Sequence, residues 1–144
     1  MDKNNNIAER VKQANRDVYN KKSADIYDKN ESIFNEHRQA ACIEKLAKIS
    51  ELAGNETFLD VGTGSGNLLR TAPDFFKKCY AIDLGENLLA QIKDKYPSCF
   101  LAAADAENLP FQNDSFNAVS CYAMLHHLLT SCCHNTCLSS TRKN

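Results

Sequence analysis

The sequence predicts an α/β fold built on a parallel β-sheet, and three observations lead to this prediction. Four short apolar runs alternate with segments whose apolar residues recur at helical spacing, which is typical of strand–helix–strand units. The first run, 57–61, passes directly into a loop with glycines at alternate positions, Gly62, Gly64 and Gly66. Acidic residues stand at or just after the ends of the first three runs, at the edge where parallel strands of such folds bind ligands.

The individual elements follow from periodicity and from helix-ending residues. We expect helices over 7–22 and 36–53, where apolar residues recur at three- and four-residue steps, with Gly54 capping the second. Two shorter helices are expected over 66–72 and 86–96, because each segment runs into a proline that cannot continue a helix. The predicted strands are 57–61, 79–84, 99–103 and 116–121.

The glycine loop alone does not identify its nucleotide, but Asp60 narrows the choice. A dinucleotide fingerprint reads G-x-G-x-x-G, and Asn67 stands where its last glycine would be. Asp60 ends the first strand two residues before Gly62, and a carboxylate there would repel a pyrophosphate but attract a cation. A ligand with a nucleoside at one end and a cationic amino acid at the other fits better. A nicotinamide-dependent oxidoreductase is the weaker hypothesis.

Residues 60–66, Asp-Val-Gly-Thr-Gly-Ser-Gly, resemble motif I of the class I S-adenosylmethionine-dependent methyltransferases. The resemblance continues in 81–84, 104–111 and 114–119, and residues 124–128 are similar to the small-molecule branch of that family. It covers roughly residues 19–129. It implies a Rossmann-like class I methyltransferase fold, with a partial parallel sheet in strand order 3-2-1-4 and helices on both faces.

The resemblance also implies S-adenosylmethionine as the cofactor and assigns its contacts. Asp60 would bond the ammonium group, Asp83 both ribose hydroxyls, and Asp105 the adenine amino group. Backbone N–H groups around Gly62 and Gly64 would approach the methionine part and the ribose. The implied cofactor-binding residues are Asp60, Gly62, Thr63, Gly64, Gly66, Asp83, Leu84, Asp105 and Ala106. The alternative is that an Asp after a strand caps a helix or a turn, and it weighs most for Asp105.

No catalytic residue is assigned, and the methyl acceptor is left as a small molecule or a tRNA base. His126 or His127 is a candidate general base, although a structural role is favoured, because alignment of the acceptor can carry most of the acceleration. Tyr27 belongs to a segment, 1–35, that we expect to form a helical cap over the cofactor, with half-buried packing as the alternative role for this tyrosine.

Composition favours a cytoplasmic protein. The 144 residues carry a net charge of −1, so nothing indicates binding to nucleic acid or to an anionic membrane. There is no apolar run of membrane-spanning length and no signal-peptide core. The seven cysteines are then expected to be mostly reduced thiols.

The family pattern breaks after Leu129, where the composition changes to Ser, Thr, Cys and basic residues. We expect a partial cofactor-binding domain over 36–129 that lacks the C-terminal strands, followed by an unstructured tail over 130–144. The tail's Cys132, Cys133, His134 and Cys137 do not match the paired spacing of zinc sites, so no metal is expected. The exposed edge of the fourth strand could allow self-association, and a truncated isoform that binds a partner without turnover is the alternative function.

Overall fold

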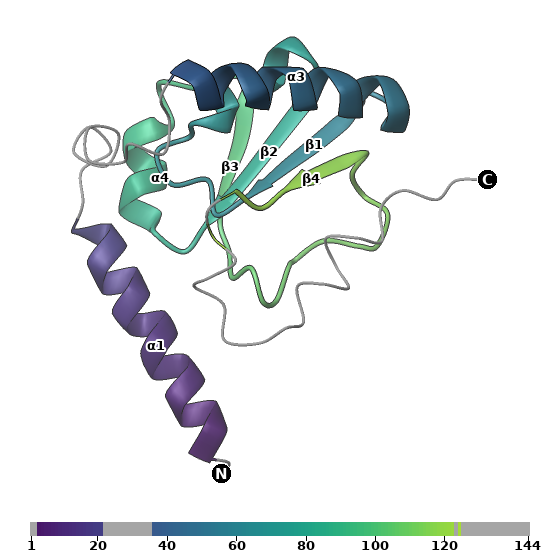
Figure 1. Ribbon diagram of the computed structural model, residues 1–144. Helices are drawn as coiled ribbons and strands as arrows, with labels where there is room; N and C mark the ends of the chain where they lie inside the picture. The colour runs from purple at the N-terminus through teal and green to yellow at the C-terminus, as the bar shows by residue number, and fades with distance from the viewer. Residues whose placement is uncertain (1–2, 22–35, 123, 125–144) are drawn as a thin grey trace.

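The computed structural model describes residues 3–21, 36–122 and 124. Its helices are α1 (Lys3–Asn20), α3 (Glu36–Ala53) and α4 (Glu86–Ile92), with two 3₁₀ turns, η2 (Leu68–Arg70) and η3 (Ala72–Asp74). Its strands are β1 (Thr57–Val61), β2 (Lys78–Asp83), β3 (Cys99–Ala103) and β4 (Ala118–Ser120). Figure 1 shows α3 along one side of the sheet, α4 beside the β3 edge, and α1 as a rod that reaches away from the sheet.

The four strands form one parallel sheet in the order β3-β2-β1-β4, which confirms the expected order. β1 is central and almost entirely buried, as expected for a strand that is covered on both faces. Thr57 pairs with Lys78 and Val61 with Ile82, so β1 and β2 end together at one edge. This register brings the residues that follow the two strands close to one another.

The two faces of the sheet are covered differently. One face packs against α3, α4 and the 3₁₀ turns, with Phe58, Cys79 and Ala81 at its centre. On the other face, Leu59 and Ile82 are covered by apolar residues of the connection between β3 and β4. Helices were expected on both faces of the sheet. In the part of the chain that is described, helices cover one face, and the connection between β3 and β4 covers the other.

The helix expected over 66–72 is wrong. Gly66 has a φ of +79°, in the left-handed region that an α-helix cannot contain. Pro73 lies in the first turn of η3 and has no N–H to donate to a longer helix. The few residues between these two positions form the 3₁₀ turns η2 and η3 instead. The other predicted elements are present, with ends that differ by a few residues.

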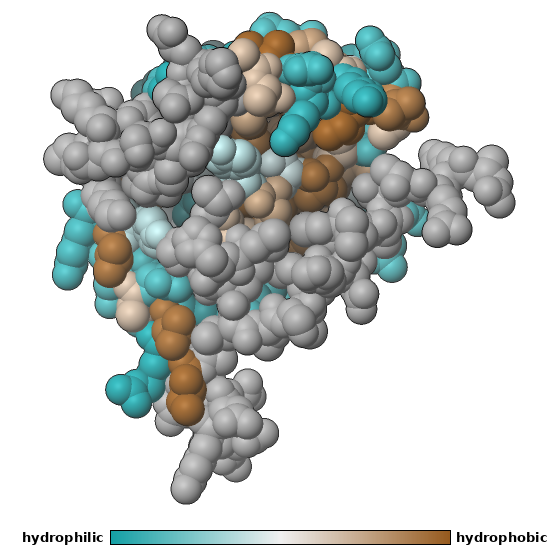
Figure 2. All heavy atoms as spheres, in the orientation of Figure 1, coloured by the Kyte–Doolittle hydropathy of each residue, from teal (hydrophilic) through white to brown (hydrophobic). Residues whose placement is uncertain are grey.

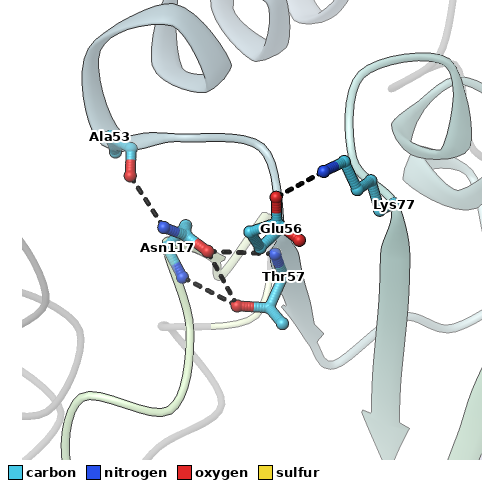
Figure 3. A network of polar contacts seen from close by, with 5 residues as sticks. All are labelled: Ala53, Glu56, Thr57, Lys77 and Asn117. Carbon is cyan, nitrogen blue, oxygen red and sulfur yellow. Dashed lines mark hydrogen bonds and ion pairs between the residues drawn. The ribbon is translucent and has the colours of Figure 1, made fainter.

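Asn117 joins the end of α3 to the start of β1 (Figure 3). Its side-chain amide donates to the Ala53 carbonyl at 2.8 Å, and its Oδ1 accepts from the backbone N–H of Thr57 at 3.0 Å. The Thr57 hydroxyl also lies 3.0 Å from Oδ1. Gly54 has a φ of +88°, which confirms its predicted role at the end of the helix, and its missing Cβ leaves room for the Asn117 amide.

Several expectations lie outside the described residues: those for Tyr27, His126 and His127, and for the tail over 130–144. Among the described helices, none is both long and apolar enough to cross a membrane. Apolar side chains are nevertheless exposed on α1 and α3, as the brown atoms in Figure 2 show. They are Ile7, Val18, Ile43, Ile49 and Leu52.

Candidate functional site

The loop after β1 requires glycine at three positions. Gly62, Gly64 and Gly66 have φ values of +75°, +55° and +79°, a region that side chains with a Cβ rarely adopt. A Cβ on Gly62 would overlap the Met124 side chain, and one on Gly66 would lie 2.5 Å from the Tyr96 ring. The alternation of glycines thus lets the loop turn sharply while neighbouring side chains pack directly on its backbone.

The N–H groups of this loop are used inside the protein. Those of Gly62 and Thr63 both donate to the Ile82 carbonyl, at 2.8 and 3.1 Å. Gly66 donates back to Thr63 at 2.9 Å, and Gly64 donates to the Asp83 carboxylate at 2.9 Å. The expectation that N–H groups of Gly62 and Gly64 face a ligand therefore finds no support here. What these glycines offer instead is close approach of the backbone.

Asp83 ends β2, and its carboxylate accepts hydrogen bonds from backbone N–H groups. Its Oδ2 accepts from Gly64 and its Oδ1 accepts from Gly85 at 2.8 Å. Burial raises the pKa of Asp83, and the backbone hydrogen bonds from Gly85, Gly64 and Leu84 oppose that rise. A carboxylate has about four lone-pair sites, so it retains capacity for a ligand hydroxyl beside these bonds. The geometry fits the predicted ribose contact while adding a second role, because Asp83 ties the glycine loop to β2.

Asp60 is a buried charge beside that loop. Its side chain is 3% exposed, and its register partner on β4 is Ser120. Burial raises the pKa of Asp60 to about 6, while the hydroxyls of Thr63 and Ser120 lower it and the charge of Asp83 raises it. Thr63 Oγ1 is buried and lacks a well-formed hydrogen bond among the described residues. With so little exposed surface, Asp60 would act on a cation mainly as a fixed negative charge.

Asp105 follows β3 and pairs with Lys12 of α1, a residue that no pattern in the sequence marks as part of a site. The Lys12 ammonium lies 2.6 Å from Asp105 Oδ2 and 2.8 Å from Glu107 Oε2. The hydrogen bonds to Asp105 and Glu107 raise the pKa of Lys12. The other oxygen, Oδ1, accepts the backbone N–H of Glu107 at 2.9 Å, which is the turn role considered as the alternative.

The N-terminal helix α1 contacts the site region at its C-terminal end as well. Asn20 accepts from the backbone N–H of Asn87 at 3.2 Å, and its carbonyl accepts from the Asn87 side chain at 3.1 Å. Tyr19 packs beside Gly85, two residues after Asp83. Together with Lys12, these contacts place α1 against the segments that follow β2 and β3.

The predicted site residues thus gather at one edge of the sheet. Asp60 and the glycine loop lie at the end of β1, next to Asp83 at the end of β2. The Ala104 N–H donates to the Asp83 carbonyl at 3.1 Å, which brings the segment that carries Asp105 beside them. Leu84 is half-buried at this edge, whereas Ala106 packs on the Leu59 side of the sheet. Three carboxylates around a glycine turn can hold a ligand that carries hydroxyls and positive charge.

Residues 59–137 match a family described as the methyltransferase domain. The family match ends at residue 137, which lies beyond Leu129, where the resemblance was expected to end. A tRNA (carboxymethyluridine(34)-5-O)-methyltransferase of Arabidopsis thaliana is 32% identical over 106 residues, which cover 73% of this chain and 25% of that protein. The chain therefore spans about a quarter of the length of that curated relative.

Two solved structures show the same fold over part of their length. An S-adenosylmethionine-dependent methyltransferase from Clostridium acetobutylicum matches with a TM-score of 0.55 and 27% identity, over 68% of this chain and 41% of that one. An amino pentose methyltransferase from Micromonospora echinaspora, solved with S-adenosylmethionine bound, matches with a TM-score of 0.51 and 25% identity. That match covers 59% of this chain and 35% of the other.

Proposed function

Since this chain belongs to the class I S-adenosylmethionine-dependent methyltransferase family, we propose that it binds S-adenosylmethionine at the carboxyl edge of its sheet for methyl transfer to an acceptor. The observation that carries the proposal is the arrangement of Asp83. Its carboxylate holds the Gly64 N–H at 2.9 Å, lies close enough to Asp60 for their charges to interact, and keeps lone-pair capacity for a ribose hydroxyl.

The residues at this edge fit the chemistry of such a ligand. The cofactor supplies a methyl group on a positively charged sulfur, together with an ammonium group. The buried negative charge of Asp60 favours positive charge nearby, more strongly than in water because the site is partly desolvated. Asp83 would hold the ribose, and Asp105 and Leu84 would position the adenine. Binding in one orientation is what a methyl transfer requires most, since the acceptor must lie in line with the bond that breaks.

Asp105 can bind the adenine only if it shares its carboxylate with its present hydrogen-bond partners or exchanges one of them for the ligand. Its Oδ2 bonds Lys12 and its Oδ1 bonds the Glu107 N–H, so an adenine amino group would use a remaining lone pair or displace the lysine. We propose that α1 forms part of the cofactor site for this reason, in line with the cap that the sequence predicts over 1–35.

The acceptor is proposed to be a small molecule or a tRNA base. The Arabidopsis relative is named for a tRNA uridine and the Micromonospora relative for an amino pentose, so the family members similar to this chain span both classes. With a net charge of −1, the chain carries no excess of basic residues for RNA, which favours the small molecule.

Binding without turnover is the second candidate function. The part that aligns amounts to 41% of the Clostridium enzyme and 25% of the Arabidopsis protein. The cofactor-side edge is within that part. Production of S-adenosylhomocysteine with candidate acceptors would support the enzyme, and saturable cofactor binding without product would support the second function.

Calorimetric titration with S-adenosylmethionine tests the binding proposal. We expect saturable binding to the full chain, a higher melting temperature with ligand, and loss of both on Asp83→Ala. Asp94→Ala is the matched control, because Asp94 is exposed in the turn after α4 and away from the site. NAD should not compete. Absence of binding to a folded wild-type chain, or equal loss in both variants, would refute the proposed site.

A further inference from the structure

Two cysteines face each other on neighbouring strands, away from the candidate site. Cys79 on β2 and Cys99 on β3 are register partners in the parallel ladder, so both side chains point to the same face of the sheet. The same ladder pairs Asp83 with Ala103 at the carboxyl edge. The thiol pair therefore belongs to the two strands that lead to the site, but it lies near their N-terminal ends, and the site lies at their C-terminal ends.

The spacing of the two residues suits a covalent bond. Adjacent strands lie about 4.8 Å apart, and a disulfide joins Cα atoms that are roughly 4.4–6.8 Å apart. Cys79 and Cys99 are both free thiols in this structure. Cys79 belongs to an apolar cluster that includes Phe76, and Cys99 packs against the same cluster. The Cys79 thiol also lies 3.9 Å from the Phe76 carbonyl oxygen.

The two sulfurs differ in access and in acidity. Cys79 is 2% exposed, whereas Cys99 is half-buried. The hydrogen bond with Cys99, together with burial, raises the pKa of Cys79. The same hydrogen bond lowers the pKa of Cys99 against the effect of burial, and Ser98 lowers it further. Cys99 is therefore suited to be the attacking thiolate, with Cys79 held behind it.

We propose that Cys79 and Cys99 form a reversible thiol–disulfide pair whose co-reactant is a small disulfide such as oxidised glutathione. The Cys99 thiolate attacks one sulfur of that disulfide, forms a mixed disulfide and releases one glutathione thiolate. The Cys79 thiol loses its proton and attacks the Cys99 sulfur, forming the Cys79–Cys99 bond and releasing the second glutathione. Two protein thiols are oxidised and one glutathione disulfide is reduced to two thiols, so atoms and electrons balance.

The bond would join the strands that carry Asp83 and lead to Asp105, without using any residue of the candidate site. It is therefore a modification site in addition to the proposed cofactor site, and its test does not depend on cofactor binding. Its order of events is also specific, since Cys99 must react first and Cys79 must resolve the adduct.

Peptide mapping by mass spectrometry tests this order. The native full chain is incubated with oxidised glutathione, quenched with acid, alkylated and digested. We expect a linked pair of peptides that contain Cys79 and Cys99, and its loss on treatment with a reducing dithiol. Cys42→Ser is the matched control, because Cys42 is a half-buried free thiol on α3, and it should leave the link unchanged.

Two further variants separate the roles of the cysteines. Cys79→Ser should accumulate a stable glutathione adduct on Cys99, because the resolving thiol is gone. Cys99→Ser should leave Cys79 unmodified, because that thiol is buried. A stable adduct on wild-type Cys99 without the link, or an unreactive Cys99, would overturn the proposal. The wild-type map decides the matter even if a variant fails to fold.

Discussion

Gly64 and Asp83 are joined by a hydrogen bond of 2.9 Å, from the backbone N–H in the loop after β1 to the carboxylate at the end of β2. The two residues are 19 positions apart in sequence. Through this bond, the acidic residue that we assign to the ribose also fixes the glycine loop. Structure and ligand binding at this edge therefore depend on the same side chain.

Replacing Asp83 is expected to cost stability as well as binding. In Asp83→Asn, one oxygen becomes an amide that cannot accept, so either Gly64 or Gly85 loses its partner. We expect a loss of about 1–3 kcal/mol in the free energy of unfolding, measured by urea denaturation. Asp94→Asn is the control and should stay within about 0.5 kcal/mol of wild type. A fully stable Asp83→Asn variant would show that the Gly64 bond contributes nothing.

Replacing Asp60 should have the opposite effect on the ligand-free protein. The pKa of Asp60 is about 6 in the folded state, against 3.8 for a free side chain. Its contribution to stability is thus present below pH 4 and lost as the pH rises through 6, by about 3 kcal/mol at 1.36 kcal/mol per unit. Asp60→Asn removes the buried charge and keeps oxygen and nitrogen for the Thr63 and Ser120 hydroxyls.

We therefore expect Asp60→Asn to melt above wild type at pH 8, with the gap closing towards pH 5. The same variant should bind S-adenosylmethionine more weakly. Thermal melting across this pH range, with and without the cofactor, checks both expectations. A gap that stays constant with pH would mean that Asp60 does not titrate in this range.

The contact between Gly66 and Tyr96 predicts a second structural dependence. In Gly66→Ala the new Cβ would lie 2.5 Å from Tyr96 Cε2, at a φ of +79°. The left-handed conformation alone costs roughly 1–2 kcal/mol for alanine, and the overlap adds to it. Tyr96→Leu should relieve the overlap but not the backbone strain. A double-mutant cycle by denaturation should then show a favourable coupling of about 0.5–3 kcal/mol. Simple additivity would show that Tyr96 moves aside freely.

Asn117 is expected to be among the most sensitive polar residues of the sheet. Asn117→Ala leaves the Ala53 carbonyl and the Thr57 N–H without their partner, which predicts a loss of about 2–4 kcal/mol. Asn117→Asp keeps the acceptor but places a negative charge at the C-terminal end of α3, so it should also destabilise. Asn113→Ala, at an exposed position, is the control for urea denaturation. Equal midpoints for the Asn117 and Asn113 variants would contradict this role.

The sequence was sufficient for the features that depend on one element at a time. Apolar runs located the four strands, and the parallel order placed Asp60 and Asp83 at one edge because both end a strand. Features that depend on distant segments were not predictable. Lys12 meets Asp105 across 93 residues, and Asn117 fits a space that exists only once Gly54 and Thr57 are in place. The region expected as a helix over 66–72 also contacts a distant segment, since the Tyr96 ring packs on the Gly66 backbone.

Lys12 provides the last prediction, because it connects α1 to the segment that carries Asp105. In Lys12→Met, the carboxylates of Asp105 and Glu107 lose their shared cation and repel one another. Loss of charge-assisted bonds at these half-buried groups should weaken the attachment of α1 by about 1–2 kcal/mol. Hydrogen exchange of α1 amides should then be roughly 5- to 30-fold faster, while that of β1 stays unchanged.

Lys77→Met is the matched control for this experiment. Lys77 also forms an ion pair, with Glu56 at 2.5 Å (Figure 3). The two side chains are, however, 63% and 61% exposed. Such a pair contributes little in water, so its loss should leave exchange in α1 at the wild-type rate. If Lys12→Met and Lys77→Met gave the same exchange in α1, the Lys12 ion pairs would not hold that helix. The proposal that α1 forms part of the cofactor site would then lose its structural basis.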